Sequence, residues 1–320
     1  MRSVRVFATA LAVAAIAFPV TATERVTVDG AWTAMAPLPD ERSEVSVATD
    51  GTLLYLLGGF SRAPDGSPSA PVEVYAYDPA ADSWTHLTDL AEGVNHAGLA
   101  FLDGALYVIG GYRGATFQAT NAVRIFDLAA GTWRDGPALP TARGALTVAV
   151  VNGRIHAIGG ESGGVRFGAH NVLDPATGAW TAAADLPTPR DHLAAGVVGN
   201  EIIVLAGRNE RTMTIDANEI YDVATDTWRS GAPVPTGRSG VAAAVLDGEV
   251  YLFGGETSDS TFDEAERYDP ATDSWAILPP MPTARHGLGA ATIGRSIYVV
   301  SGGLQAGFYL SDINDRLDPE

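Results

Sequence analysis

Short hydrophobic runs recur along the chain in pairs, and a tight-turn dipeptide joins the two members of each pair. GALTVAV (144–150) precedes RIHAIGG (154–160) around Asn152-Gly153, and VAAAVL (241–246) precedes EVYLFGG (249–255) around Asp247-Gly248. Asn-Gly and Asp-Gly favour the positive φ angles of two-residue hairpins. Each pair therefore predicts two antiparallel strands, followed by a variable loop and a third strand such as VEVYAYD (72–78).

The third run ends in a phrase that returns five times. Its copies are YDPAADSW (77–84), FDLAAGTW (126–133), LDPATGAW (173–180), YDVATDTW (221–228) and YDPATDSW (268–275). The Asp can cap a turn through its side chain, and the Asp or Gly two residues before the Trp tolerates a left-handed conformation. The phrase therefore predicts a turn after which the Trp opens a fourth strand.

The tryptophans measure the period. They are Trp32, Trp84, Trp133, Trp180, Trp228 and Trp275, and a Gly follows each of them after 27 residues: Gly59, Gly111, Gly160, Gly207, Gly255 and Gly302. A four-stranded unit cannot bury both its faces alone, so neighbouring units must stack. Short β units of this length, arranged radially, make an all-β, six-bladed β-propeller.

The two ends of the chain predict how the ring closes. The last third strand stops at Leu317-Asp318-Pro319-Glu320, where a Trp should follow, whereas Trp32 has no third strand before it. We therefore expect the N-terminal strand to complete the last blade, which leaves no open sheet edge.

These motifs resemble the kelch family, in which a glycine doublet precedes an aromatic-Asp pair and a Trp follows six residues after that Asp. The doublets are Gly58-Gly59, Gly110-Gly111, Gly159-Gly160 and Gly254-Gly255, and Ala206-Gly207 and Ser301-Gly302 depart from the pattern. The resemblance spans nearly the whole mature chain and implies a kelch-type propeller.

The N-terminus is typical of a secretion signal. Arg2 and Arg5 precede an apolar run, and Val20-Thr21-Ala22 suits a signal peptidase, so we expect a signal peptide at 1–22 and the propeller at 23–320. This predicts a secreted or periplasmic protein with no membrane insertion after cleavage. The net charge of −18 disfavours nucleic acid, and the absence of Cys excludes disulfides and thiolate sites.

Ten residues after each Trp the repeat carries an arginine, except for Val94 in the second blade. The five are Arg42, Arg143, Arg190, Arg238 and Arg285. In a four-stranded meander this connection lies at the same end as the variable loops, so we expect a ring of guanidinium groups at the channel mouth. Arg suits carboxylates and phosphates. The alternative is a structural role, in which each Arg pairs with an acid such as Glu44 or Asp191, or with loop carbonyls.

Histidines form a second candidate layer at the same mouth. His96 and His192 lie twelve residues after a Trp and His286 lies eleven after one, so the three imidazoles should approach one another. Such a group could bind a metal or carry protons. Loop histidines more often hydrogen-bond locally, so we predict no metal and no cofactor. His156 takes a slot that Tyr holds in other blades, which indicates core packing.

The leading hypothesis is a non-catalytic, extracytoplasmic binding protein for an anionic small molecule, a sugar or an acidic peptide, at the channel mouth. The alternative is a carbohydrate isomerase or mutarotase, because the chain resembles exported kelch proteins of the sialic-acid mutarotase type. Glu44, His96 and His192 would then be the candidate proton-transfer groups. Lack of Cys excludes the copper-radical chemistry of galactose oxidase-like propellers. An architectural scaffold for a protein partner is the third hypothesis.

Overall fold

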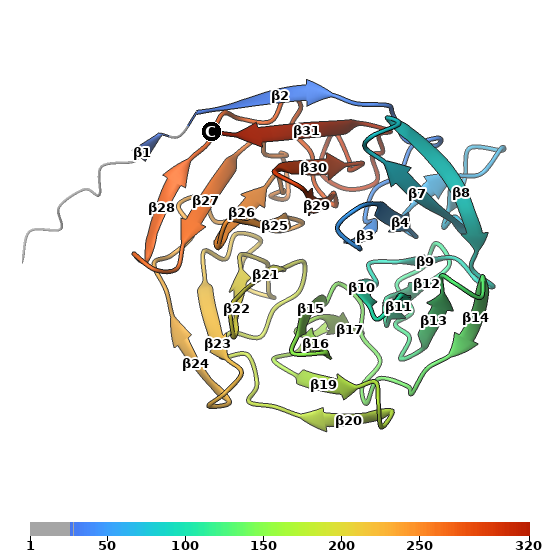
Figure 1. Ribbon diagram of the computed structural model, residues 1–320, viewed down its shortest axis with the longest axis horizontal. Helices are drawn as coiled ribbons and strands as arrows, with labels where there is room; N and C mark the ends of the chain where they lie inside the picture. The colour runs from blue at the N-terminus through green and yellow to red at the C-terminus, as the bar shows by residue number, and fades with distance from the viewer. Residues whose placement is uncertain (1–25, 28) are drawn as a thin grey trace, which may run out of the picture.

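Six antiparallel sheets surround a central axis in the computed structural model, which describes residues 26–27 and 29–320 (Figure 1). Blades one to three consist of β3 (Ser46–Thr49), β4 (Leu54–Leu57), β7 (Glu73–Asp78) and β8 (Ser83–Asp89); β10 (Gly98–Leu102), β11 (Ala105–Ile109), β13 (Val123–Asp127) and β14 (Thr132–Asp135); and β15 (Thr147–Val151), β16 (Arg154–Ile158), β19 (His170–Asp174) and β20 (Ala179–Ala182). The predicted signal peptide at 1–22 lies outside the described residues.

Blades four to six repeat the arrangement. They consist of β21 (Ala194–Val198), β22 (Glu201–Leu205), β23 (Asn218–Asp222) and β24 (Thr227–Ser230); β25 (Ala242–Leu246), β26 (Glu249–Phe253), β27 (Ala265–Asp269) and β28 (Ser274–Ile277); and β29 (Gly289–Ile293), β30 (Ser296–Val300), β31 (Asn314–Pro319) and β2 (Gly30–Ala34). Short ribbons decorate the loops: β5 (Ser61–Arg62) with β6 (Pro68–Ser69), β9 (Val94–Asn95) with β12 (Tyr112–Arg113), and β17 (Glu161–Ser162) with β18 (Val165–Arg166). The six-bladed prediction is confirmed.

The N-terminal strand closes the ring as predicted. β2 pairs antiparallel with β31 and places Trp32 opposite Leu317, so the first strand of the chain becomes the outer strand of the last blade (Figure 1). β1 (Val26–Thr27) pairs parallel with β28 of blade five. The closure therefore leaves the sixth blade with a full set of four strands.

The recurring phrase links each blade to the one before it. Asp82 has a φ of 45°, and its Oδ1 accepts hydrogen bonds from the Tyr77 hydroxyl at 2.6 Å and from the Ala36 N–H at 2.8 Å. Trp84 donates from Nε1 to the Ala36 carbonyl at 3.0 Å. The same bonds recur in blades four and five, so the Asp and the Trp bind the segment that follows the preceding outer strand.

Both departures from the glycine doublet keep its backbone geometry. Ala206 has a φ of 57° and Ser301 a φ of 61°, close to the 68° of Gly58 in the regular repeats. A left-handed conformation costs a side chain-bearing residue roughly 1–2 kcal/mol, which the surrounding blade must offset. These two repeats therefore fold like the others.

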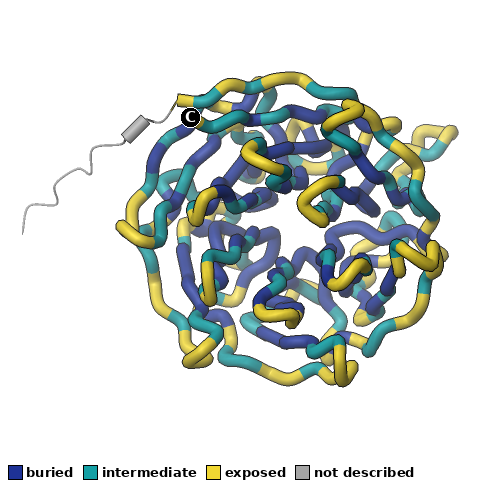
Figure 2. Tube along the Cα trace, viewed as in Figure 1, coloured by how far each residue is buried: buried dark blue, intermediate teal, exposed yellow. Residues whose placement is uncertain are grey.

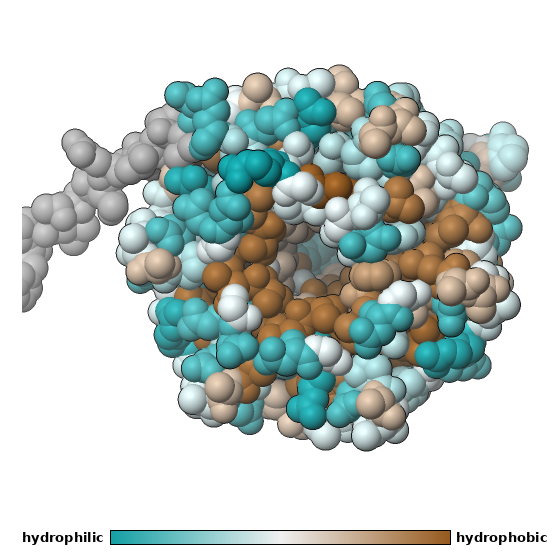
Figure 3. Space-filling model, in the orientation of Figure 1, coloured by the Kyte–Doolittle hydropathy of each residue, from teal (hydrophilic) through white to brown (hydrophobic). Residues whose placement is uncertain are grey.

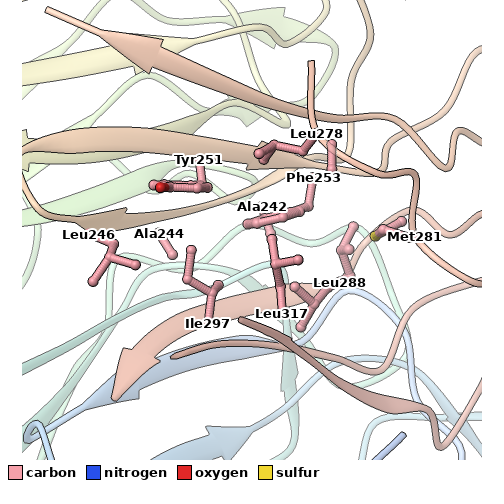
Figure 4. Close-up of a cluster of buried hydrophobic side chains, with 12 residues drawn as sticks. Ala242, Ala244, Leu246, Tyr251, Phe253, Leu278, Met281, Leu288, Ile297 and Leu317 are labelled. Carbon is pink, nitrogen blue, oxygen red and sulfur yellow. The ribbon is translucent and has the colours of Figure 1, made fainter. Parts of the chain in front are cut away.

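The core consists of apolar clusters between successive blades. In Figure 4, Phe253 and Tyr251 of blade five face Ile297 and Leu317 of blade six, with Leu278 at the edge of the cluster. Figure 2 shows that the inner and middle strands are buried, whereas exposure concentrates in the turns and the outer rim. Among residues 26–27 and 29–320, no helix has the length and apolar character to cross a membrane.

Candidate ligand site at the channel mouth

The five repeated arginines do not form a ring around the channel mouth, so that prediction is wrong. Arg42, Arg143, Arg190, Arg238 and Arg285 are each 0% exposed. Their side chains lie inside the blades, where a buried cation is tolerable only with hydrogen-bonding partners. No surface of these guanidinium groups is left for a ligand.

Each arginine instead ties the mouth connection to the second and third strands of its own blade. Arg238 donates to the Gly254 carbonyl at 2.5 Å and to Glu266 Oε2 at 2.6 Å. Arg285 pairs with Asp315 at 2.8 Å. The structural alternative therefore holds. The arginines bind carbonyls at the glycine doublet and, for the most part, acids or amides of the third strand, rather than Glu44 or Asp191.

The remaining arginines follow this scheme with different partners. Arg190 pairs with Glu219, and Arg42 with Asp40 and Glu73. Arg143 donates to the Ala157 carbonyl at 3.1 Å and to Asn171 Oδ1 at 3.0 Å.

The residues that do surround the axis lie two positions later in the repeat. One comes from each blade, twelve residues after its Trp: Glu44, His96, Ala145, His192, Gly240 and Gly287. All six have φ between 51° and 66°. Each N–H donates to the carbonyl of its counterpart in the preceding blade at 2.6 to 3.3 Å, and Glu44 donates to Gly287, which completes a circle. We call these six residues the mouth ring.

A second layer lies above the mouth ring. The residue eleven after each Trp bridges antiparallel to the residue just after the glycine doublet, as in Asp191 with Arg208 or Ser239 with Glu256. This pairing places the start of every variable loop beside the mouth ring. A cavity of about 400 Å³ lies between the loops. Its lining residues are Glu44, Phe60, Pro68, His96, Ala115, Phe117, His192, Arg208, Glu256, His286, Gly307 and Phe308.

The structure brings the predicted imidazoles and Glu44 together at the floor of this cavity. His96 Nε2 lies 3.2 Å from Glu44 Oε2, and His286 Nε2 lies 3.5 Å from Glu44 Oε1. The rings of His96 and His192 are 4.8 Å apart. The intervening blade carries the small Ala145 in the mouth ring, which leaves room for this contact.

Hydrogen bonds set which nitrogen of each imidazole carries a proton. Asn95 donates from Nδ2 to the Gly114 carbonyl at 2.7 Å, so its Oδ1 faces His96 and accepts from Nδ1–H at 2.6 Å. His192 donates from Nδ1 to Asp191 Oδ1 at 2.5 Å. In both rings Nδ1 is occupied, and Nε2 faces the cavity as an acceptor.

A buried acid and an arginine form hydrogen bonds with the two ring nitrogens of His192. Asp191 is 1% exposed and accepts from Arg166 Nε and from Arg208 Nε, both at 2.8 Å. Arg208 also donates from Nη2 to His192 Nε2 at 2.9 Å and reaches Glu256 at 3.3 Å. Burial alone would raise the pKa of Asp191, but the His192 and arginine contacts hold that pKa well below its usual range. The network fixes Asp191 as a carboxylate.

Burial and charge act in opposite directions on Glu44. Burial would raise the pKa of its carboxyl, but the surrounding imidazoles, led by His96, and the Arg208 guanidinium lower that pKa to about 2. Burial also lowers the pKa of the His96 imidazole, to about 3, against the opposing effect of Glu44. The cavity floor thus presents the Glu44 carboxylate beside imidazole rings.

Aromatic rings form the wall above this floor. Phe60 packs edge-on against Phe117 at 5.9 Å and Phe308 at 5.4 Å between ring centroids, and against His96 at 5.6 Å. Phe117 is 67% exposed, a large value for an aromatic residue. The site therefore combines an apolar wall with a floor of hydrogen-bonding groups. Elsewhere along the axis, apolar side chains border the central opening of the propeller on the face that Figure 3 shows.

Sequence reasoning missed Arg208, Asp191 and Glu256 as members of the site. Their signal was a constant spacing, because Arg208 and Glu256 each follow a glycine doublet position directly. The residue type at this position differs from blade to blade, so it did not stand out in the sequence. The arginines did stand out because the same residue recurs in five blades, but such a recurring residue belongs to the scaffold of the repeat.

Comparison with known proteins identifies the repeats. The KLHDC2/KLHL20/DRC7 Kelch-repeats domain model matches residues 181–316, and the Kelch motif model matches residues 41–91 and 94–140. Kelch-like protein 36 of Rattus norvegicus is 28% identical over 120 residues, which cover 37% of this chain and 20% of that protein. Kelch repeat and BTB domain-containing protein 12 of Danio rerio is 31% identical over 152 residues, which cover 43% of this chain and 24% of that protein. The matches span only a fifth to a quarter of these relatives.

A solved structure supports the fold over nearly the full length. The structure of YjhT superimposes with a TM-score of 0.76, covering 88% of this chain and 96% of YjhT, at 17% sequence identity. At that identity the similarity concerns the arrangement of the blades.

Proposed function

The chain is a six-bladed β-propeller built of kelch repeats, and we propose that it binds a carbohydrate in the cavity at the channel mouth. The observation that carries the proposal is the composition of this cavity. Pockets of this size typically join apolar walls to a few well-placed polar groups. The phenylalanine wall offers faces for sugar rings, and the floor offers acceptors for hydroxyl groups.

The charges at the floor favour a sugar over a strongly acidic ligand. Arg208 is the arginine that lines the cavity, and its guanidinium already contacts Asp191 and Glu256. Its positive charge is therefore largely balanced before a ligand arrives. Kelch repeats also serve protein interactions in many proteins, so an acidic peptide is the competing ligand class.

The test is a binding screen with matched variants. Neutral sugars, acidic sugars and acidic peptides are compared by thermal shift and calorimetry. Phe117 is exposed, so Phe117→Ala should weaken sugar binding about tenfold without altering the melting temperature. Val165→Ala, at an exposed position on a neighbouring loop, is the control and should bind as the parent does. Binding of peptides alone, or equal sugar affinity in Phe117→Ala, would reject the proposal.

A mutarotase is the second candidate, and the Glu44–His96 contact favours it. Mutarotation requires one group to take the proton of the anomeric hydroxyl and another to deliver a proton to the ring oxygen. Glu44 and the imidazoles of His96 and His192 lie close enough to share these roles. Exchange between anomers, followed by NMR, should accelerate with the parent protein and lose that acceleration in Glu44→Gln. If a bound sugar exchanges between anomers no faster than it does without the protein, the mutarotase candidate is rejected and the binding function alone remains.

We also propose that the protein is exported, on the strength of the N-terminal sequence. Expression of the full chain in a bacterial host should yield a mature form that begins at Thr23, measured by intact mass. Retention of residues 1–22 in the extracytoplasmic fraction would contradict the predicted cleavage.

A further inference from the structure

Two imidazoles and a carboxylate come close together at the cavity floor, an arrangement that sugar binding does not require. We propose that Glu44, His96 and His192 bind one divalent transition-metal ion, such as Zn²⁺. The sequence alone predicted no metal, because histidines on loops more often hydrogen-bond locally. The inference goes beyond the proposed function and stands or falls separately from it.

The three side chains lie within reach of one shared metal ion. One donor atom from each of the three residues lies within 4.8 Å of the other two. His96 Nε2 and Glu44 Oε2 are 3.2 Å apart. Two ligands bound to one tetrahedral Zn²⁺ at 2.0–2.1 Å lie roughly 3.3 Å from each other. Imidazole and carboxylate together suit Zn²⁺ and related first-row ions.

The outer contacts are those of metal-binding histidines. A ligating imidazole normally donates its other ring N–H to a carboxylate, carbonyl or amide oxygen, which orients the ring. His96 donates in this way to Asn95, whose amide is itself anchored on Gly114, and His192 donates to Asp191. Both rings are therefore held by Nδ1, which leaves Nε2 on the side of the cavity that they line.

A proton on His96 Nε2 or a metal ion bound by both residues would satisfy the contact between His96 and Glu44. Because Nδ1 of His96 is committed to Asn95, its Nε2 presents a lone pair to a carboxylate oxygen at 3.2 Å. Two acceptors at that distance repel each other unless a proton or a cation lies between them. His286 extends the set, since its Nε2 is 3.5 Å from both Glu44 and Glu256.

Arg208 is the competitor of the ion. Its Nη2 donates to His192 Nε2 at 2.9 Å, so the guanidinium must withdraw before that nitrogen can ligate. Arg208 keeps its partners Asp191 and Glu256 on the far side, and its side chain is 21% exposed. Replacing Arg208 by Gln should therefore strengthen metal binding about tenfold, an effect that a simple proton-sharing pair would not produce.

The repeat itself provides variants that should fold. His96→Ala and His192→Ala place in blades two and four the residue that blade three carries at Ala145, with φ of 52°. Asn95→Ser copies Ser43 and Ser239 at the equivalent position. His86→Ala removes an exposed histidine outside the cavity and is the control.

The experiment titrates Zn²⁺ alone into the full chain, purified without a polyhistidine tag and dialysed against EDTA. Calorimetry should give one ion per chain, with affinity 10 to 100-fold lower in His96→Ala, His192→Ala and Asn95→Ser and unchanged in His86→Ala. Co²⁺ should produce visible absorption bands in the parent that His96→Ala loses.

Equal affinity in the parent and in the doubly substituted His96→Ala/His192→Ala chain would overturn the proposal. So would weaker Zn²⁺ binding in Arg208→Gln. Sugar binding measured in EDTA is a separate readout: if it persists while Zn²⁺ fails to bind, only the metal site is rejected.

Discussion

The backbone N–H of Glu44 donates to the carbonyl oxygen of Gly287 at 2.6 Å and joins the first blade to the sixth. The bond closes the mouth ring at the point where the two ends of the propeller meet. It also fixes the main chain of the one carboxylate in that ring. Substitutions near this bond should therefore affect the stability of the ring and the geometry of the site together.

The mouth ring offers a matched pair of glycine substitutions. Gly240 and Gly287 both have positive φ, but an added Cβ at Gly287 would lie 2.5 Å from Glu44 Cδ, whereas at Gly240 the nearest atom is 3.4 Å away. Gly240→Ala should cost about 1 kcal/mol of unfolding free energy, from conformation alone. Gly287→Ala should lower the free energy of unfolding by about 2 kcal/mol more than Gly240→Ala does, and it should also weaken ligand binding. Urea denaturation measures the first effect and calorimetry the second. Equal costs would mean that Glu44 moves freely.

Closure by the N-terminal strand makes the ring sensitive to truncation. Removing residues 25–36 deletes β2 and the half-buried Trp32, whose indole donates to the Pro279 carbonyl at 3.0 Å. The loss of several hydrogen bonds and of this apolar contact should exceed about 4 kcal/mol. Scanning calorimetry should show a melting temperature at least about 10 °C lower. A truncated chain as stable as the parent would contradict the closure.

The buried arginines should govern stability rather than ligand affinity. Arg190→Ala and Arg238→Ala leave Glu219 and Glu266 buried without a cation, so each should cost about 3–5 kcal/mol. Arg143→Ala should cost less, because its side-chain partner is the neutral Asn171.

A double-mutant cycle separates this ion-pair effect from lost packing. Arg190→Leu/Glu219→Leu should recover much of the stability that Arg190→Leu loses, measured by denaturant unfolding. No recovery would show that the arginine acts through packing alone.

Two buried histidines in blade three should make the protein sensitive to acid. His156 Nδ1 and His170 Nε2 are 2.8 Å apart, and burial lowers the pKa of each ring to about 4. In the unfolded chain the pKa is about 6.5, so between these values the unfolded state binds more protons and stability falls as the pH falls. From pH 7 to pH 5 the loss should be about 2 kcal/mol for each histidine.

The sixth blade supplies the matched variant for this measurement. Tyr298 and Asn314 occupy there the positions of His156 and His170. His156→Tyr/His170→Asn should therefore fold and lose less stability than the parent between pH 7 and pH 5, as followed by urea unfolding at each pH. Parallel pH profiles would show that these rings do not titrate.

The local pattern determined the blades. Because every Trp lies 27 residues before its glycine, each hairpin, turn and outer strand could be assigned from spacing alone, and the unpaired ends at Trp32 and Leu317 predicted the closure. These features depend on contacts within one repeat or between adjacent repeats. A repeated sequence therefore specifies them directly.

The chemistry of the mouth depended on the tertiary structure. Spacing placed Arg190 and His192 near the channel, but only the folded blade shows that Arg190 turns inward to Glu219 while His192 faces the axis. The meeting of Glu44 with His96 and of His192 with Arg208 also depends on side-chain directions that no repeat period encodes. Backbone position follows from the repeat, whereas the neighbours of a side chain across a channel exist only once all six blades have closed around it.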